Sequence, residues 1–297
     1  MRQRIHISKK MSELTLSLII PTPNFLERLP EELRKLGYKV LVNDTDCMCD
    51  FMIGMSHSVT GQIGRFHYLT PNVPLILYNW DWYDFVDKTS GDWLEFTRMM
   101  KEDCKEVWSA SKITAEKCFK DTQIKSDFWN YCYILPEEWK GETKDGGYII
   151  QASRNSEQKR FDWFERAGLQ NEIPTKSYHP RNNSRQDFVK AVQECSFLCV
   201  CSVDESLGGL TAAEAAYNHK PILISDFEGA KEVWGDGAWY FEKDNYEDLK
   251  EKMKWIWDNR DSNEVKEKTE KAYNRCKEIF MPEVFAKRID ERLKKIK

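Results

Sequence analysis

The sequence predicts an α/β protein of two Rossmann-like domains that face each other across a cleft. Short apolar runs alternate with helical patterns through most of the 297 residues. This alternation is interrupted by the polar, glycine-rich segment Trp139–Gly147 and restarts at Tyr148. Apolar strands that alternate with helices are typical of a parallel sheet covered on both faces. The chain is also long enough for two domains of about 150 residues each.

The composition favours a soluble cytoplasmic protein with well-filled cores. Hydrophobic residues make up 41% of the chain and charged residues 32%. No apolar run reaches the roughly 18 residues that mark a membrane-spanning helix. Residues 1–10 are basic and lack the apolar stretch of a secretory signal, so we expect a flexible tail there. The net charge of −4 argues against a protein that coats nucleic acid.

The nine cysteines are scattered and odd in number, which predicts free thiols in a reducing compartment. Cys47 and Cys49 lack the spacing and the second pair of a zinc site. Cys199 and Cys201 fall in a predicted core strand, where a thiol behaves as a small hydrophobe. We therefore expect no structural metal.

The N-terminal domain is predicted to span residues 11–140. Apolar runs predict strands at 16–21, 39–43, 51–55, 74–78 and 106–111, and helices are predicted at 27–36, 92–104 and 113–120. Gly37 follows the first helix, a position where glycine often ends a helix. The order of these elements favours a parallel sheet.

The C-terminal domain is predicted to span residues 147–279. Strands are predicted at 148–152, 175–178, 197–201 and 221–225, and helices at 158–167, 185–195 and 210–217. From Tyr246 to Lys297 the pattern is that of charged helix with apolar faces. We expect this segment to pack back on the domains, with residues 280–297 crossing to the N-terminal domain.

The segment Glu205–Glu214 carries the most specific chemical signal in the chain. Gly208 and Gly209 lie between the strand 197–201 and the helix 210–217. Glycines at such a place let backbone N–H groups at a helix N-terminus approach an anion. The flanking carboxylates cannot bind that anion, so we expect them to accept hydrogen bonds from hydroxyl groups of the ligand. An anion site beside hydroxyl acceptors predicts a nucleotide-sugar ligand.

Three segments in this half resemble the C-terminal domain of GT-B glycosyltransferases, notably the retaining family 4. They are the strand and basic turn Ile149–Lys159, the paired-glutamate segment Glu205–Glu214, and the strand, glycine turn and tail over Pro221–Phe241. The resemblance covers residues 147–260 and implies a nucleotide-sugar-dependent glycosyltransferase of GT-B architecture. In the first half only the order of strands and helices matches.

The resemblance implies that Arg154 and Lys159 neutralise the departing nucleoside diphosphate. A guanidinium makes forked contacts with phosphate, and a lysine ammonium acts as a mobile point charge. The positive end of the helix dipole at Gly209 adds to them. These charges predict a reaction without a metal ion. The nucleotide-sugar is a co-substrate, and no separate cofactor is expected.

The same resemblance gives roles to the two glutamates. Glu214 accepts hydrogen bonds from the donor ribose, and Glu205 lies beside the transferred sugar and its phosphate. Eight residues separate them, one more than is usual in the family. Either the loop bulges at Gly208–Gly209, or Asp204 or Ser206 shares the role of Glu205. The other predicted donor contacts are Ser206, Leu207, Gly208, Gly209, Leu210 and, near the base, His179.

The N-terminal domain is expected to admit the acceptor. The family's glycine-rich loop after the first strand is replaced here by Pro21–Phe25, which leaves that contact with the diphosphate open. Asp81 and His57 each follow a predicted strand and are candidate catalytic residues beside the sugar. Asp81 could instead cap a helix. The aromatic run 78–83 could stack on a sugar or base, or pack in the core.

The sequence leaves alternatives open. The acceptor could be a glycan, a lipid-linked sugar, a protein or a modified nucleic-acid base, the last favoured weakly by the aromatic run. A sugar-nucleotide 2-epimerase shares this architecture. A catalytically silent nucleotide-sugar binding protein is a third reading, favoured by the altered glutamate spacing. The retention of anomeric configuration is implied by the resemblance alone.

Overall fold

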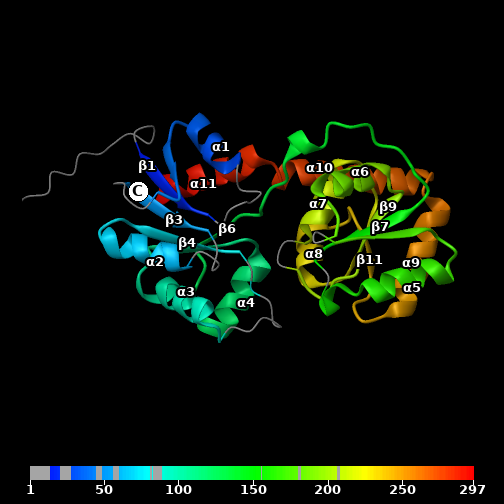
Figure 1. Cartoon of the computed structure of the whole chain (residues 1–297), viewed down its shortest axis with the longest axis horizontal. Coiled ribbons are helices and arrows are strands. Elements are labelled where there is room, and N and C mark those ends of the chain that lie inside the picture. The colour runs from blue at the N-terminus through cyan, green and yellow to red at the C-terminus, as the bar shows by residue number, and fades with distance from the viewer. Residues whose placement is uncertain are drawn as a thin grey trace, which may run out of the picture. The chain divides into compact units, whose positions relative to one another are not determined.

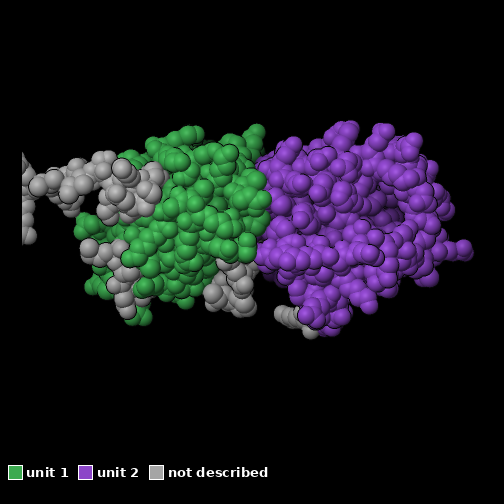
Figure 2. All heavy atoms as spheres, turned by 90° about the horizontal axis from the view of Figure 1, so that it is seen from above, with its two compact units in different colours: residues 1–130, 282–297 green, residues 131–281 purple. Residues whose placement is uncertain are grey.

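The computed structural model divides into two compact units (Figures 1 and 2). The first unit comprises residues 1–130 and 282–297, and the second comprises 131–281. The structure describes residues 14–20, 28–44, 49–55, 60–80, 82, 89–154, 156–179, 182–205 and 208–297. Each unit contains a parallel sheet with helices, which confirms the predicted pair of Rossmann-like domains.

The described part of the first unit forms a six-stranded parallel sheet in the order β2-β1-β3-β4-β5-β6. Its strands are β1 (Thr15–Ile19), β2 (Lys39–Val42), β3 (Phe51–Gly54), β4 (Leu75–Asn79), β5 (Glu106–Ser109) and β6 (Phe128–Trp129). Its helices are α1 (Leu29–Lys35), α2 (Thr60–Leu69), α3 (Gly91–Glu102), α4 (Lys112–Thr122) and α11 (Pro282–Ile296). In Figure 1, α1 and α11 cover one face of the sheet, and α2, α3 and α4 cover the other.

Helix α2 was not predicted from the sequence. Gly61 and Gly64 both lie within it, and glycine lowers helix propensity by about 1 kcal/mol relative to alanine. Ile63 is fully buried in the core of the unit, together with Leu77 of β4 and Trp93 of α3. Packing of this side chain therefore stabilises a helix that local propensity disfavours.

Helix α11 belongs to the first unit although it is the last element of the chain. It packs against α1, and Phe285, Ile289 and Leu293 of α11 are buried. Arg292 forms two hydrogen bonds, of 2.6 and 2.9 Å, with the carboxylate of Glu106 at the start of β5. Polar and apolar contacts together hold this helix on the sheet.

A buried hydrogen bond between Tyr38 and Asp290 also fastens α11. The tyrosine hydroxyl donates to Oδ1 of Asp290 at 2.8 Å, and burial together with this carboxylate raises the pKa of Tyr38. Replacing Tyr38 with phenylalanine should lower the free energy of unfolding by about 1–3 kcal/mol, because the carboxylate keeps its burial and loses a partner. Urea unfolding measures this change. Tyr68→Phe is the matched control, since that ring is 83% exposed, and an equal loss in both variants would contradict the prediction.

The described part of the second unit forms a five-stranded parallel sheet in the order β11-β10-β9-β7-β8. Its strands are β7 (Ile149–Ala152), β8 (Thr175–Tyr178), β9 (Phe197–Val200), β10 (Ile222–Ser225) and β11 (Trp239–Phe241). Its helices are α5 (Phe161–Gln170), α6 (Arg185–Glu194), α7 (Leu210–Tyr217), α8 (Glu228–Trp234), α9 (Tyr246–Asn259) and α10 (Asn263–Ile279). In Figure 1, α5 and α9 lie on one face of this sheet, and α6 and α7 lie on the other.

One helical prediction for this half needs correction. The helix expected at 158–167 is a 3-10 turn, Glu157–Lys159, followed by α5, because Arg160 between them adopts the left-handed φ of 48°. The charged helical pattern from Tyr246 onward forms the three helices α9, α10 and α11. Ser262 caps α10 through its side chain, and Pro282 at the first turn of α11 cannot continue a preceding helix.

The division between the units lies earlier than the segment Trp139–Gly147. Tyr131 already belongs to the second unit, where its hydroxyl bonds to Glu232 of α8. The backbone N–H of Ile134 donates to the carbonyl of Phe280 at 2.9 Å. Segment 131–138 and the end of α10 therefore lie side by side. The described residues contain no helix with the length and apolar character needed to cross a membrane.

Candidate functional site

The strand order of the second unit defines a switch point between β7 and β9. The chain leaves β7 toward β8 on one side, and it continues from β9 toward β10 and β11 on the other. Ligands of open parallel sheets bind beyond the carboxyl ends of the strands at such a point. Segment Ser153–Lys159 follows β7, and segment Cys201–Gly209 follows β9. Both segments that the sequence singled out therefore begin at the same edge of the sheet.

Lys159 and Glu205 form an ion pair across this switch point. The ammonium of Lys159 bonds to Oε1 of Glu205, and the hydroxyl of Ser202 donates to the same oxygen at 2.8 Å. Lys159 is only 4% exposed. The side-chain amide of Gln151, buried within β7, donates to the backbone carbonyl of Lys159. The turn after β7 is thus fixed to the strand and aims the lysine at the loop after β9.

Arg154 differs from Lys159 in its surroundings. Its residue is exposed, and its guanidinium has no hydrogen bond or ion pair with any residue that the structure describes. Its backbone carbonyl accepts a hydrogen bond of 3.1 Å from the hydroxyl of Ser153. Arg154 therefore offers an uncommitted cation next to the carboxyl end of β7.

The glycine turn before α7 requires two left-handed residues. Gly208 has φ of 65° and Gly209 has φ of 83°, a region that residues with a Cβ atom rarely adopt. A Cβ atom on Gly208 would lie 2.8 Å from Cβ of Val233 in α8. The indole N–H of Trp234 donates to the carbonyl of Gly208 at 2.7 Å. Helix α8 thus holds the turn in place.

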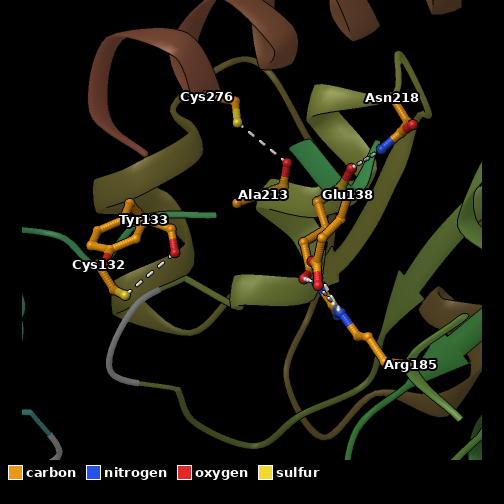
Figure 3. A network of polar contacts seen from close by, with 8 residues as sticks. Cys132, Tyr133, Glu138, Arg185, Ala213, Asn218 and Cys276 are labelled. Carbon is orange, nitrogen blue, oxygen red and sulfur yellow. Dashed lines mark hydrogen bonds and ion pairs between the residues drawn. The ribbon is translucent and has the colours of Figure 1, made fainter. Parts of the chain in front are cut away.

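Glu214 lies on the first turns of α7 and is 4% exposed. Arg185, the first residue of α6, bonds to the carboxylates of both Glu214 and Glu138. Figure 3 shows its guanidinium pointing toward Glu138. Burial raises the pKa of Glu214 to about 7, although Arg185 opposes that rise. The side-chain amide of Asn218 donates to the backbone carbonyl of Glu214. Glu214 is thus an acceptor whose charge changes near neutral pH.

A pocket of about 260 Å³ opens beside these residues at the carboxyl ends of β7 and β8. Its lining includes Ser153, Tyr178, His179, Asn183, Arg185 and Thr211. His179 packs its ring 4.2 Å from that of Phe161, and its buried Nδ1 has no hydrogen-bond partner in the described structure. The pocket is large enough for a base or a ribose.

The structure brings together most predicted site residues of the second unit. The segments at the switch point contain Lys159, Glu205, Gly208, Gly209 and Leu210. His179 lines the pocket, and Glu214 bonds to Arg185, which also lines it. Ser206 and Leu207 lie outside the described residues, and so do His57 and Asp81 in the first unit. In the residues that the structure describes, no group of His, Cys, Asp and Glu is arranged to hold a metal ion.

Arg185 and Glu138 were missed by the sequence reasoning. One signal could have found Arg185. A cation at the first position of a helix is disfavoured by the helix dipole, so an arginine there needs another reason. Here the reason is the buried carboxylate of Glu214 and the rings of Trp139 and Phe188, which lie 5.4 and 5.1 Å from the guanidinium carbon.

A family model matches this half of the chain. Residues 147–275 match the model described as glycosyl transferases group 1. This range contains the whole switch-point site and the pocket. No curated protein matches the chain.

Solved structures with a similar fold extend the comparison to both units. Anabaena Alr3699/HepE in complex with UDP and glucose has a TM-score of 0.71 at 11% identity, covering 95% of this chain and 100% of that one. Sucrose-phosphate synthase from Thermosynechococcus elongatus has a TM-score of 0.74 at 9% identity, covering 95% and 99%. A glycosyltransferase from Rickettsia africae has a TM-score of 0.59 at 13% identity, covering 96% and 98%.

At these identities the solved structures establish the fold, and the family model adds the class of enzyme. The chain is therefore a glycosyltransferase of GT-B fold, and its residues 147–275 match the model of glycosyl transferases group 1.

Proposed function

We propose that this chain transfers a hexosyl group from a uridine diphosphate sugar to a hydroxyl-bearing acceptor, without a metal ion and with retained anomeric configuration. The observation that carries the proposal is the joint position of Arg154, Lys159 and the Gly208–Gly209 turn at the switch point. Support for the uridine nucleotide comes from the Anabaena Alr3699/HepE structures, which contain UDP or UDP-glucose. The family 4 resemblance supports retention.

The proposed reaction breaks the bond between the anomeric carbon and the diphosphate oxygen, and the electron pair leaves with the diphosphate. The acceptor oxygen then bonds to the same face of the sugar, and its proton passes to the leaving phosphate. Negative charge grows on that phosphate in the transition state, and preorganised cations and N–H groups stabilise such charge. Arg154 is free to reach it, while Lys159 and the N-terminus of α7 contribute a fixed positive field.

The ion pair with Glu205 has a specific purpose in this proposal. A buried lysine without a counter-ion is costly and tends to lose its proton. Glu205 is that counter-ion for Lys159 and directs its ammonium at the loop after β9. Donor phosphate can then share this cation. Charge neutralisation by Arg154 and Lys159 is the reason that no metal ion is needed in the proposal.

The test combines donor binding with product analysis. We expect UDP-glucose or another UDP-sugar to raise the melting temperature of the chain, because ligands that bind the folded state stabilise it. A labelled donor incubated with candidate acceptors should yield a labelled glycan, glycolipid, protein or nucleic acid. Recovery of a 2-epimer would identify an epimerase instead. Binding without any turnover across the acceptor panel would identify a silent binding protein.

Donor affinity should depend on pH through Glu214. Burial raises the pKa of this carboxyl to about 7, so the charged form that accepts ribose hydrogen bonds dominates only above that pH. The affinity for UDP-glucose should therefore rise about tenfold between about pH 6 and pH 8. The charge of this donor stays constant over the range, which isolates the protein group. Glu214→Gln should flatten the profile, and a wild-type profile that is already flat would contradict the role of Glu214.

A further inference from the structure

A second pocket lies at the opposite end of the sheet in the second unit. It has a volume of about 320 Å³, and its lining includes Asp145, Ser196, Lys220, Arg260, Lys266 and Glu270. The first three precede β7, β9 and β10, whereas the switch-point site follows the strands. Lys266 and Glu270 come from the first half of α10. This pocket is therefore separate from the donor site and uses no residue of it.

Lys220 is the unusual group in this pocket. It is 6% exposed, and its ammonium donates to the backbone carbonyl of Lys144 at 2.8 Å. An ammonium carries three N–H donors, so this bond leaves two available. Among the described residues, no carboxylate lies within ion-pair distance of it. Burial lowers the pKa of Lys220 as a consequence. Because an unpaired buried charge is costly, an anion bound to this ammonium would be stabilising.

The carboxylates near Lys220 are already engaged. Asp145 accepts hydrogen bonds from the Ser196 hydroxyl, from the N–H of Gly147 at 2.9 Å, and from Arg260 at 3.2 Å. These contacts lower the pKa of Asp145 against its burial. Glu270 lies 3.2 Å from Nδ1 of His219. These two carboxylates are therefore exposed and paired with other donors, and neither forms an ion pair with Lys220.

The rest of the pocket also suits an anion. Lys266 is exposed on the first turns of α10, at the positive end of a helix of 17 residues. The carboxylate of Asp261 also lines this pocket, but it is exposed, so water and salt screen its repulsion of a bound anion. A volume of about 320 Å³ accommodates a small metabolite in addition to its charged group.

We propose that this pocket binds a small phosphorylated metabolite, with its phosphate on the buried Lys220 ammonium and Lys266 contacting it from the pocket mouth. A phosphate oxygen accepts the two spare N–H groups, and phosphate is a common partner of lysine. This pocket shares no residue with the donor site, so its proposed ligand does not depend on the proposed sugar transfer. It adds a ligand of a different class to the enzyme.

The test compares variants of the full chain by thermal shift, with inorganic phosphate, glucose 6-phosphate and glucose as probes. Wild type should be stabilised by both phosphates and not by glucose. Lys220→Met keeps the aliphatic stem and should weaken phosphate binding at least about tenfold, as loss of a charge-assisted hydrogen bond does. Lys266→Ala should weaken it less. Arg154→Ala should keep the phosphate response, and Lys220→Met should keep the response to UDP-glucose.

Three results would overturn the proposal: an undiminished phosphate response in Lys220→Met, loss of the response in Arg154→Ala, or no response in wild type. If Lys220→Met does not fold, wild type can be labelled with a small acylating reagent and mapped by mass spectrometry. Phosphate should then protect Lys220 and leave the exposed Lys190 of α6 unaffected. Equal labelling of Lys220 with and without phosphate would equally refute the site.

Discussion

Arg154→Ala should lower the rate of sugar transfer by about 10²–10³-fold, the cost of removing one group that stabilises transition-state charge. The guanidinium is exposed and makes no hydrogen bond or ion pair with any described residue. Its removal therefore leaves no buried group unpaired, and the melting temperature without ligand should not change. Because the diphosphate is bound before and during transfer, donor affinity should also fall. Steady-state kinetics with a UDP-sugar and a melting curve measure the two effects.

Arg166→Ala is the matched control for this variant. Arg166 is an exposed arginine of the same unit, on α5, with its guanidinium 3.8 Å from the ring of Tyr246. We expect it to keep its activity, since it lies away from the carboxyl ends of β7 and β9. Arg154→Lys should recover part of the rate, because lysine keeps the charge and loses the forked contact. Equal activity of Arg154→Ala and wild type would show that the diphosphate does not bind beside Arg154 as we propose.

Lys159→Met should affect stability as well as activity. Removing one partner of a buried ion pair typically costs about 3–5 kcal/mol, because the other charge remains buried and unpaired. Here the remaining group is Glu205, whose side chain is 17% exposed, so we expect the lower part of that range. Transfer should fall to background, since both the fixed cation and the position of the loop are lost. Denaturant unfolding and labelled-donor assays separate these two losses.

The double variant Lys159→Met with Glu205→Gln distinguishes pairing from simple packing. It removes both charges and should recover most of the lost stability, since neutral groups of similar shape can replace a buried pair at little cost. It should not recover transfer. A double variant as unstable as Lys159→Met would mean that the lysine stem, and not its charge, stabilises the loop. Restored transfer would remove Lys159 from the catalytic role that we propose.

Much of the fold follows from patterns visible in the sequence. The strands β3 and β9 are continuous apolar runs, and β4, β7 and β10 are apolar except for Asn79, Gln151 and Ser225. Such runs are typical of strands buried on both faces. The switch-point site could also be predicted from the sequence, because two adjacent glycines, Gly208 and Gly209, lie between a strand and a helix. The family resemblance added the expected roles of Arg154 and Lys159.

The remainder depends on contacts between distant residues. Helix α2 exists because Ile63 is buried, although its glycines argue against a helix. The break at Arg160 depends on its left-handed backbone and on an ion pair with Asp244, 84 residues away. The pairing of Arg185 with Glu214 spans 29 residues and cannot be read from local spacing. Each of these features is decided by tertiary packing.

The attachment of α11 to the first unit has a consequence for biosynthesis. A ribosome releases Tyr38 and Glu106 long before Asp290 and Arg292, their partners on α11. The second unit is complete in the nascent polypeptide while the first still lacks its closing helix. During synthesis the N-terminal domain usually folds first. Here the first unit can be completed only after the second, because α11 follows the second unit in the chain. Until α11 has left the ribosome, the sheet face beside α1 lacks this helix and exposes apolar surface that chaperones bind.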